Sequence, residues 1–328
     1  LTRVLLGLGL GCLILALLVG IIGLCLGGRF GSFQPTPGGM RYLPEAQDAS
    51  FWVWLDDEES RDMQTVALPA DSFAGVTVDG GLAAVTVRAG ERWKLTTTHP
   101  ELYEVSQKDG RLVIDSREPG ITGQTVQHAR LILEVPEDAV LDRLELDTGL
   151  GSLTGENLTA ETLVVDAGMG SVTLTGITVQ GDAQLDCGMG TLTVDGLTAG
   201  TVSGECGMGS VELTDLTADS LELSCDMGTL TGTGLTVRGD TALDCGGGTM
   251  DVTGDLAGSL TADCGMGILT VTTPEPESYS LDGSCGLGAL TVGDRSVSGA
   301  GSLSIDSNAT VRYRLTVDMG TLTVRFAE

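Results

Sequence analysis

The segment Leu185-Asp186-Cys187-Gly188-Met189-Gly190-Thr191-Leu192-Thr193-Val194 recurs, with small changes, from Gly149 nearly to the end of this 328-residue chain. Its Gly-x-Gly triad begins at Gly149, Gly168, Gly188, Gly207, Gly246, Gly265 and Gly286, and Asp226-Met227-Gly228 and Asp318-Met319-Gly320 are variants of it. The successive spacings are 19, 20, 19, 19, 20, 19, 21 and 32 residues. A fixed period in this range is the sequence signature of a solenoid, in which every repeat forms one coil.

A single repeat, residues 168–187, has the alternation of apolar and polar residues that is typical of β-strands. The apolar positions that we expect to face inward are Val172, Leu174, Ile177, Val179, Ala183, Leu185 and Cys187. The alternation stops at Gly168-Met169-Gly170, Gly176 and Gly181, where glycine could supply the positive φ angles of corners. We therefore predict three short strands and three corners per coil. Coils stacked about 4.8 Å apart would bury the apolar side that a lone coil exposes.

Comparing the repeats with one another defines two further columns of apolar residues. The column before each triad reads Thr148, Ala167, Cys187, Cys206, Cys225, Cys245, Cys264, Cys285 and Val317. The column in the middle of each triad reads Leu150, Met169, Met189, Met208, Met227, Gly247, Met266, Leu287 and Met319. Cysteine exchanges with small residues in the first column, and methionine, a flexible core filler, exchanges with leucine in the second. We expect both columns to lie in the core.

Composition and charge exclude several classes of function. The chain has a net charge of −28, 49 glycines and 4% aromatic residues, which suits a thin solenoid core better than a globular one. Between Arg143 and Arg295 the only basic residue is Arg238. Such a surface repels phosphate backbones, so we expect no nucleic-acid binding. It also disfavours contact with anionic lipid beyond a membrane anchor.

An uncharged apolar run at residues 4–28 lies between Arg3 and Arg29 and is long enough to span about 30 Å of hydrocarbon. A cleaved signal peptide is the alternative, but its apolar part usually has only about 7–15 residues. We therefore predict a transmembrane signal anchor at residues 1–29, with the acidic domain outside the cell membrane. Residues 30–62 form a juxtamembrane linker that contains Phe51-Trp52-Val53-Trp54. This aromatic cluster could cap the first coil, which we favour, or meet the membrane interface or a partner.

The rest of the chain, residues 63–328, is predicted to be one all-β solenoid, a parallel β-helix with about 19–20 residues per coil. Residues 63–147 alternate without the triads and are expected to form irregular N-terminal coils, followed by regular coils at residues 148–292. Residues 293–328 are expected to form a C-terminal cap with a Ser-rich loop at residues 296–307. Arg312, Arg314 and Arg325 would place charge on the open edge, where a bare edge invites pairing.

The segments 131–136, 141–147 and 149–153, together with the Leu-Thr-Ala turn that follows, resemble a bacterial β-strand-repeat family of unknown function labelled "putative adhesin". The similarity covers roughly residues 65–325, and the glycine triads are fairly specific to this family. The resemblance implies a cell-envelope β-solenoid that is often membrane-anchored. It implies no catalytic residues.

Three features of the sequence could form ligand sites. The six cysteines from Cys187 to Cys285 would form a row, but they lack the convergent spacing of a zinc site, and side chains in parallel register give poor disulfide torsions. We therefore expect reduced, buried thiols. Outward threonine pairs could bind ice, although Glu212, Asp251 and Asp195 interrupt them; the pairs are Thr173/Thr175, Thr191/Thr193, Thr229/Thr231, Thr270/Thr272 and Thr321/Thr323. Asp186, Asp244 and Asp263 could bind calcium loosely at the surface, but the Gly-Gly-x-Gly-x-Asp motif of built sites is absent.

Nothing in the sequence indicates an enzyme. His99 and His128 are the only histidines, and no nucleophile and base surround them. We predict no catalytic, cofactor-binding or metal-binding residues. We expect a non-catalytic structural, adhesive or envelope-sensing role, with the membrane as one partner through residues 4–28 and a protein or glycan of the envelope as another. The alternative is a β-helix that binds or cleaves polysaccharide, against which stands Tyr279 as the only aromatic residue between Leu144 and Asp294.

Overall fold

The computed structural model describes residues 32–36, 39–43, 62–117 and 129–327. These belong to two compact units, residues 1–60 and residues 61–328. In the first unit, β1 (Ser32–Thr36) pairs antiparallel with β2 (Gly39–Leu43). The expected membrane anchor at residues 4–28 and the aromatic cluster at residues 51–54 lie outside the described residues. Within the described ranges, no helix is long and apolar enough to cross a membrane.

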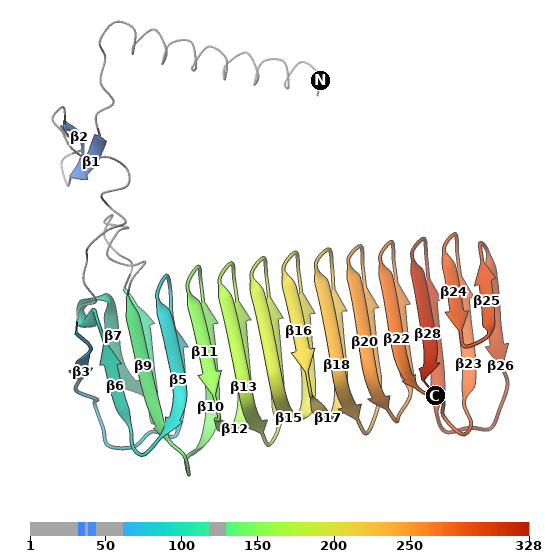
Figure 1. Cartoon of the computed structure of the whole chain (residues 1–328), viewed down its shortest axis with the longest axis horizontal. Coiled ribbons are helices and arrows are strands. Elements are labelled where there is room, and N and C mark those ends of the chain that lie inside the picture. Colours follow the sequence, from blue (N-terminus) through green and yellow to red (C-terminus); the bar gives the residue numbers. More distant parts are fainter. Residues whose placement is uncertain (1–31, 37–38, 44–61, 118–128, 328) are drawn as a thin grey trace, which may run out of the picture. The chain divides into compact units, whose positions relative to one another are not determined.

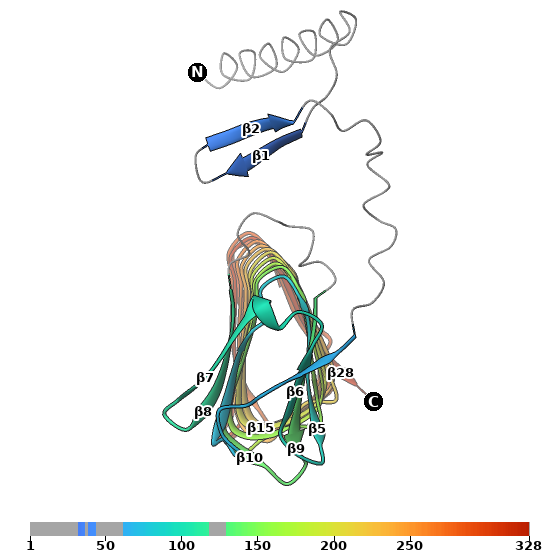
Figure 2. The ribbon, with the colours of Figure 1, turned by 90° about the vertical axis from the view of Figure 1, so that its left-hand side faces the viewer.

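The second unit is a stack of β-coils in which each strand pairs in parallel with the equivalent strands of the coils before and after it (Figure 1). In the register, Val172 pairs with Leu192 and Cys187 pairs with Cys206, so that equivalent residues of successive repeats lie side by side. Viewed along the stack, the coils superimpose around a narrow interior (Figure 2). The regular strands are β10 (Val140–Thr148), β11 (Ser152–Glu156), β12 (Thr159–Ala167), β13 (Ser171–Val179), β14 (Asp182–Cys187), β15 (Thr191–Cys206), β16 (Ser210–Thr214), β17 (Thr217–Cys225), β18 (Thr229–Val237), β19 (Thr241–Cys245), β20 (Thr249–Leu256), β21 (Leu260–Cys264) and β22 (Ile268–Pro274). The chain is thus an all-β solenoid, as the repeat period predicts.

The core lies at the positions that the alternation of apolar and polar residues predicts. All seven residues that were expected to face inward in the repeat 168–187 are at most 3% exposed. The intervening Thr173 and Gln184 face solvent. Each coil therefore contributes one thin layer of Val, Leu, Ile, Ala and Cys, and stacking continues this layer into a column that excludes water.

The corners differ from the expectation in two ways. In the repeat 168–187 the first two predicted segments join into one strand, because β13 continues through a bend at Gly176 (φ 64°). In the coils of β11 and β12 and of β16 and β17, the second and third segments join instead. Gly196, Gly234, Asn157 and Asp215 occupy the equivalent left-handed position in other coils, and these are the residue types that tolerate it.

The glycines of the triads, in contrast, do not have positive φ, and the prediction that they supply it is wrong for them and for Gly181. They are needed because adjacent corners stack closely. A Cβ atom on Gly188 would lie 2.9 Å from the carbonyl oxygen of Gly168, and one on Gly190 would collide with the carbonyl oxygen of Gly170.

The N-terminal end consists of irregular coils, and here spatial order departs from chain order. The elements are β3 (Gln64–Val66), β4 (Gly75–Asp79), β5 (Ala84–Gly90), β6 (Lys94–Thr97), the 3-10 helix η1 (Pro100–Leu102), β7 (Tyr103–Lys108), β8 (Arg111–Ser116) and β9 (Arg130–Pro136). The coil of β4 and β5 lies between that of β8 and β9 and that of β10 and β11. Antiparallel pairs of β6 with β9 and of β7 with β8 accompany the outermost coil.

The C-terminal end is rearranged in the same way. Its strands are β23 (Ser280–Cys285), β24 (Ala289–Val292), β25 (Arg295–Ser298), β26 (Gly301–Ile305), β27 (Arg312–Val317) and β28 (Thr321–Ala327). The coil of β27 and β28 is inserted between that of β21 and β22 and that of β23 and β24 (Figure 1). Residues 312–327 are therefore an internal coil, which corrects the expectation that Arg312, Arg314 and Arg325 protect the open edge. The antiparallel strands β25 and β26 cover that edge instead.

Candidate interaction surface

The middle residues of the triads lie on the surface, and their predicted place in the core is wrong. Exposed fractions run from 53% at Met189 to 78% at Leu287. The members are Leu150, Met169, Met189, Met208, Met227, Met266, Met319 and Leu287 in spatial order, and we call them the methionine ridge. Gly247 interrupts it between Met227 and Met266. The surface of a soluble protein rarely exposes so many large apolar side chains in one line.

The geometry of the triad explains this exposure. Cys187 before the triad and Gly190 at its end are both buried, so the residue between them occupies the apex of the corner and projects outward. Backbone hydrogen bonds fix the spacing of the ridge, since the N–H of Met189 donates to the carbonyl of Gly168 (2.8 Å) and that of Met208 donates to Gly188 (2.8 Å). Apolar character alone could not reveal this direction, although the flanking glycines are a usable signal.

A column of carboxylates runs parallel to the ridge. Asp79, Asp147, Asp166, Asp186 and Glu205 are in register on five successive coils, and we call them the acidic ladder. Burial, followed by repulsion from Asp166, Asp79 and Glu145, raises the pKa of Asp147 above its usual range. Like charges at this spacing destabilise one another unless a cation or a cationic partner lies nearby.

Three members of the acidic ladder, Asp166, Asp186 and Glu205, line a shallow groove of about 390 Å³ beside the ridge. Four carboxylates line this groove: Asp166, Asp186, Glu205 and Asp226. Gly188 and Gly207, which directly precede Met189 and Met208, also line it. The anionic groove therefore lies next to the apolar ridge.

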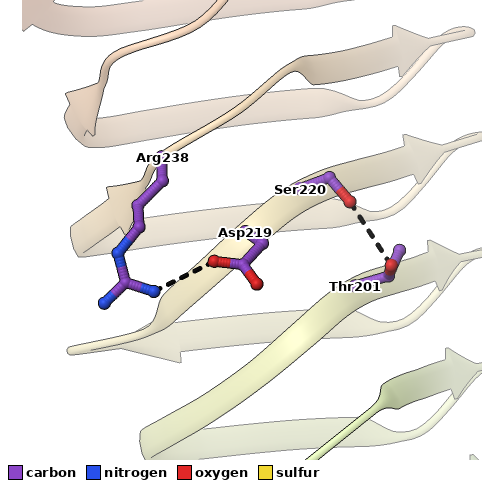
Figure 3. Close-up of polar contacts among 4 residues, drawn as sticks. All are labelled: Thr201, Asp219, Ser220 and Arg238. Carbon is purple, nitrogen blue, oxygen red and sulfur yellow. Dashed lines mark hydrogen bonds and ion pairs between the residues drawn. The ribbon is translucent and has the colours of Figure 1, made fainter.

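Arg238, the only basic residue between Arg143 and Arg295, does not neutralise this surface. Arg238 donates from Nη1 to Oδ1 of Asp219 at 2.9 Å, and both side chains are about two-thirds exposed (Figure 3). Nearby, Ser220 donates to Oγ1 of Thr201 at 3.4 Å. Among the described residues, the other ion pairs, Arg88–Glu134 and Arg143–Glu145, precede the regular triads.

The cysteine column is core, as predicted. Cys187, Cys206, Cys225, Cys245 and Cys264 are in register on consecutive coils, and Val317 separates Cys264 from Cys285. All six are free and buried. Burial raises the pKa of Cys187 and Cys225, and burial together with the neighbouring thiols raises the pKa of Cys206 to about 12. A shared hydrogen bond raises the pKa of Cys245 and lowers that of Cys264.

Replacing Cys206 and Cys225 together by alanine is expected to leave a folded solenoid. The cost should be that of two small cavities, about 1–3 kcal/mol in all, because Ala167 already occupies this column. Urea denaturation measures this cost. Thiol titration, before and after unfolding, is done on the parent chain, which keeps all six cysteines of the column and has serine at Cys12 and Cys25. The thiolate is the reactive form, so burial should delay all six thiols until unfolding. Fewer than six thiols in the unfolded, unreduced protein would contradict this result.

The threonine pairs lie on one face in register, which their spacing predicts. Thr173 pairs with Thr193, and Thr270 pairs with Thr323. Glu212 follows Thr193 in the same column, and Asp251 follows Thr231, so charge divides the array. A flat hydroxyl surface long enough to organise ice is therefore not continuous here.

The candidate metal and catalytic residues do not converge. Asp186, Asp244 and Asp263 lie on separate coils, and the structure, over the residues it describes, brings no three His, Cys, Asp or Glu side chains into a metal-binding arrangement. His99 is 3% exposed, with Nδ1 2.8 Å from Oγ1 of Thr98. His128 lies outside the described residues.

Two other hollows lie near the ends of the stack. One of about 490 Å³ is lined by polar residues of the segment 304–309 together with Asp282, Arg312 and Arg314. The other, about 240 Å³, is mostly apolar and is lined by Leu82, Leu102, Tyr103 and Leu150, where the methionine ridge begins.

The fold and its surface define the class of protein: a parallel β-solenoid repeat protein whose outward side chains form long columns. More particularly, the chain belongs to the Toastrack DUF4097 family, whose model matches residues 77–325. This result confirms the resemblance to bacterial adhesin-like proteins of unknown function.

Two solved structures from Parabacteroides distasonis share the fold. One, described as a "putative lipid binding protein", is 12% identical with a TM-score of 0.51 and covers 81% of this chain and 96% of its own. The other, described as a "putative adhesin", is 12% identical with a TM-score of 0.50 and covers 80% of this chain and 97% of its own. No curated protein matches the chain. At this identity the two structures carry information on the fold alone.

Proposed function

We propose that this protein is a membrane-anchored, extracytoplasmic solenoid that acts as a non-catalytic adhesive or structural component of the bacterial envelope. The observation that carries the proposal is the in-register arrangement of outward side chains, such as the acidic ladder from Asp79 to Glu205. Catalysis needs different groups that converge on one reacting atom. Repetition of one group along a stack instead suits the binding of an extended partner at many equivalent points.

The membrane anchor and the outward topology of this proposal rest on the apolar run at residues 4–28. Protease added to intact cells is expected to digest the domain after Arg29, because its coils would lie outside the membrane. The measurement is an immunoblot against the solenoid, with a cytoplasmic protein as control. Full protection of the solenoid, in cells without an outer membrane in the way, would contradict the proposed topology.

An envelope-binding assay tests the adhesive role against a polysaccharide-cleaving one. The purified chain is incubated with isolated cell-wall glycan and with envelope membranes, and co-sedimentation and newly formed reducing ends are measured. The proposal requires retention of the chain without a rise in reducing ends. Release of reducing ends would favour the alternative β-helix enzyme, and absence of retention on every fraction would contradict adhesion.

A further inference from the structure

The exposure of the methionine ridge needs a physical reason, because nothing in the coil itself requires apolar side chains there. At the one interruption, a Cβ atom on Gly247 would meet only ordinary contacts, 3.6 Å from the carbonyl oxygen of Asp226. The corner therefore accommodates side chains without using them for packing. Neighbouring outward columns vary freely, as when Glu212 replaces the threonine at Thr193 and Thr231. The ridge nevertheless contains only Met, Leu and one Gly.

We propose that the methionine ridge and the adjacent acidic ladder form a docking surface for an amphipathic helix of another protein, whose apolar stripe is flanked by Lys or Arg. This inference names the partner class of the binding role proposed above and rests on that role.

Charge complementarity selects the partner. The groove beside the ridge presents Asp166, Asp186, Glu205 and Asp226, and Arg238, the only basic residue between Arg143 and Arg295, is paired with Asp219 at another site. A helix with basic side chains beside its apolar stripe would offset the repulsion within this row. A second copy of the chain, with its own net charge of −28, and an anionic lipid surface would both be repelled.

The spacing between successive ridge residues matches one face of a helix better than one face of an extended strand. Successive coils lie about 4.8 Å apart, so the ridge offers one apolar side chain at that interval. Residues on one face of a helix recur every 3.5 residues on average, which advances about 5.3 Å, whereas alternate residues of a strand advance about 6.7 Å. From Leu150 to Met227 the ridge is uninterrupted over five coils, and a helix of about 14 residues covers this length. Methionine adapts its shape to the apolar stripe of such a partner.

The experiment measures binding of the full-length chain to fluorescent 18-residue peptides by anisotropy. One peptide carries a leucine stripe flanked by lysine, a second has glutamate in place of lysine, and a third has the first composition in scrambled order. The first peptide should bind at least tenfold more tightly than either of the others, and its binding should weaken as salt rises. Equal binding of the glutamate peptide would overturn the inference, and so would no binding of the lysine peptide.

Variants of the chain test whether the peptide binds at the methionine ridge. Met189→Gln, Met208→Gln and Met227→Gln, combined, should weaken binding at least tenfold, because polar side chains of similar length remove the apolar contact. Thr178→Gln, Thr198→Gln and Thr236→Gln, combined on a separate exposed column, form the matched control and should leave binding unchanged. Unchanged binding by the methionine variant, shown to be folded by circular dichroism, would overturn the assignment.

Two further experiments test the role of the acidic groove and distinguish a helical partner from a lipid surface. Asp186→Asn with Glu205→Gln should weaken peptide binding and reduce its salt dependence, since the groove loses two charges. If phosphatidylcholine vesicles bind through the ridge and the lysine peptide does not, the partner is a lipid surface and the helix proposal is wrong. The envelope-binding assay described above decides the adhesive role independently, so failure of the peptide test and failure of the proposed function are distinguishable.

Discussion

Replacement of Val211 by aspartate is expected to lower the free energy of unfolding by at least about 4 kcal/mol. Val211 is 1% exposed and lies in register between Leu192 and Leu230, so the new carboxylate would have neither water nor a cation nearby. Urea denaturation followed by circular dichroism at 218 nm measures this loss. Val211→Ala separates the effect of charge from that of lost volume and should cost less than the aspartate variant.

The matched control for this change is the next residue along the strand. Glu212 faces solvent between Thr193 and Thr231, so Glu212→Lys should alter the free energy of unfolding by less than about 1 kcal/mol. Equal losses from Val211→Asp and Glu212→Lys would show that the inward and outward positions of this strand have been exchanged.

Replacement of Gly248 by alanine is expected to cost about 3 kcal/mol, which is large for the addition of one methyl group. Its Cβ atom would lie 2.5 Å from the carbonyl oxygen of Gly228 and 2.9 Å from Sγ of Cys225. The carbonyl accepts the hydrogen bond from the N–H of Thr249 in the adjacent coil, so it cannot move without breaking the stack. Chemical denaturation and hydrogen exchange at residues 229–250 measure the loss.

The same triad contains its own control. Gly247→Ala meets no close contact and has an ordinary φ, so it should be neutral or should stabilise the protein by up to about 1 kcal/mol through the unfolded chain. A comparable loss from Gly247→Ala and Gly248→Ala would contradict the stacking explanation and would favour a general intolerance of side chains at this corner.

The sequence by itself determined the coil, its period and its core. Alternation fixes which face of a strand each side chain occupies, so the inward positions from Val172 to Cys187 could be read directly. The column of cysteines could also be assigned, because alanine, valine and threonine replace cysteine there. These properties depend on residues within one repeat, and the same pattern recurs in every repeat.

Only the tertiary structure showed where the middle residues of the triads point and how the terminal coils are ordered in the stack. The sequence shows that Met189 and its equivalents are apolar, but the direction of a side chain at a corner depends on how the flanking glycines stack against the next coil. The alignment of the carboxylates from Asp79 to Glu205 into one ladder likewise follows from the register of whole coils. The insertion of β27 and β28 between earlier coils is not encoded by sequence order, because all coils present the same backbone edge and nearly the same core layer. When many edges are equivalent, chain neighbours need not become neighbours in space, and only the packing of the assembled stack selects among them.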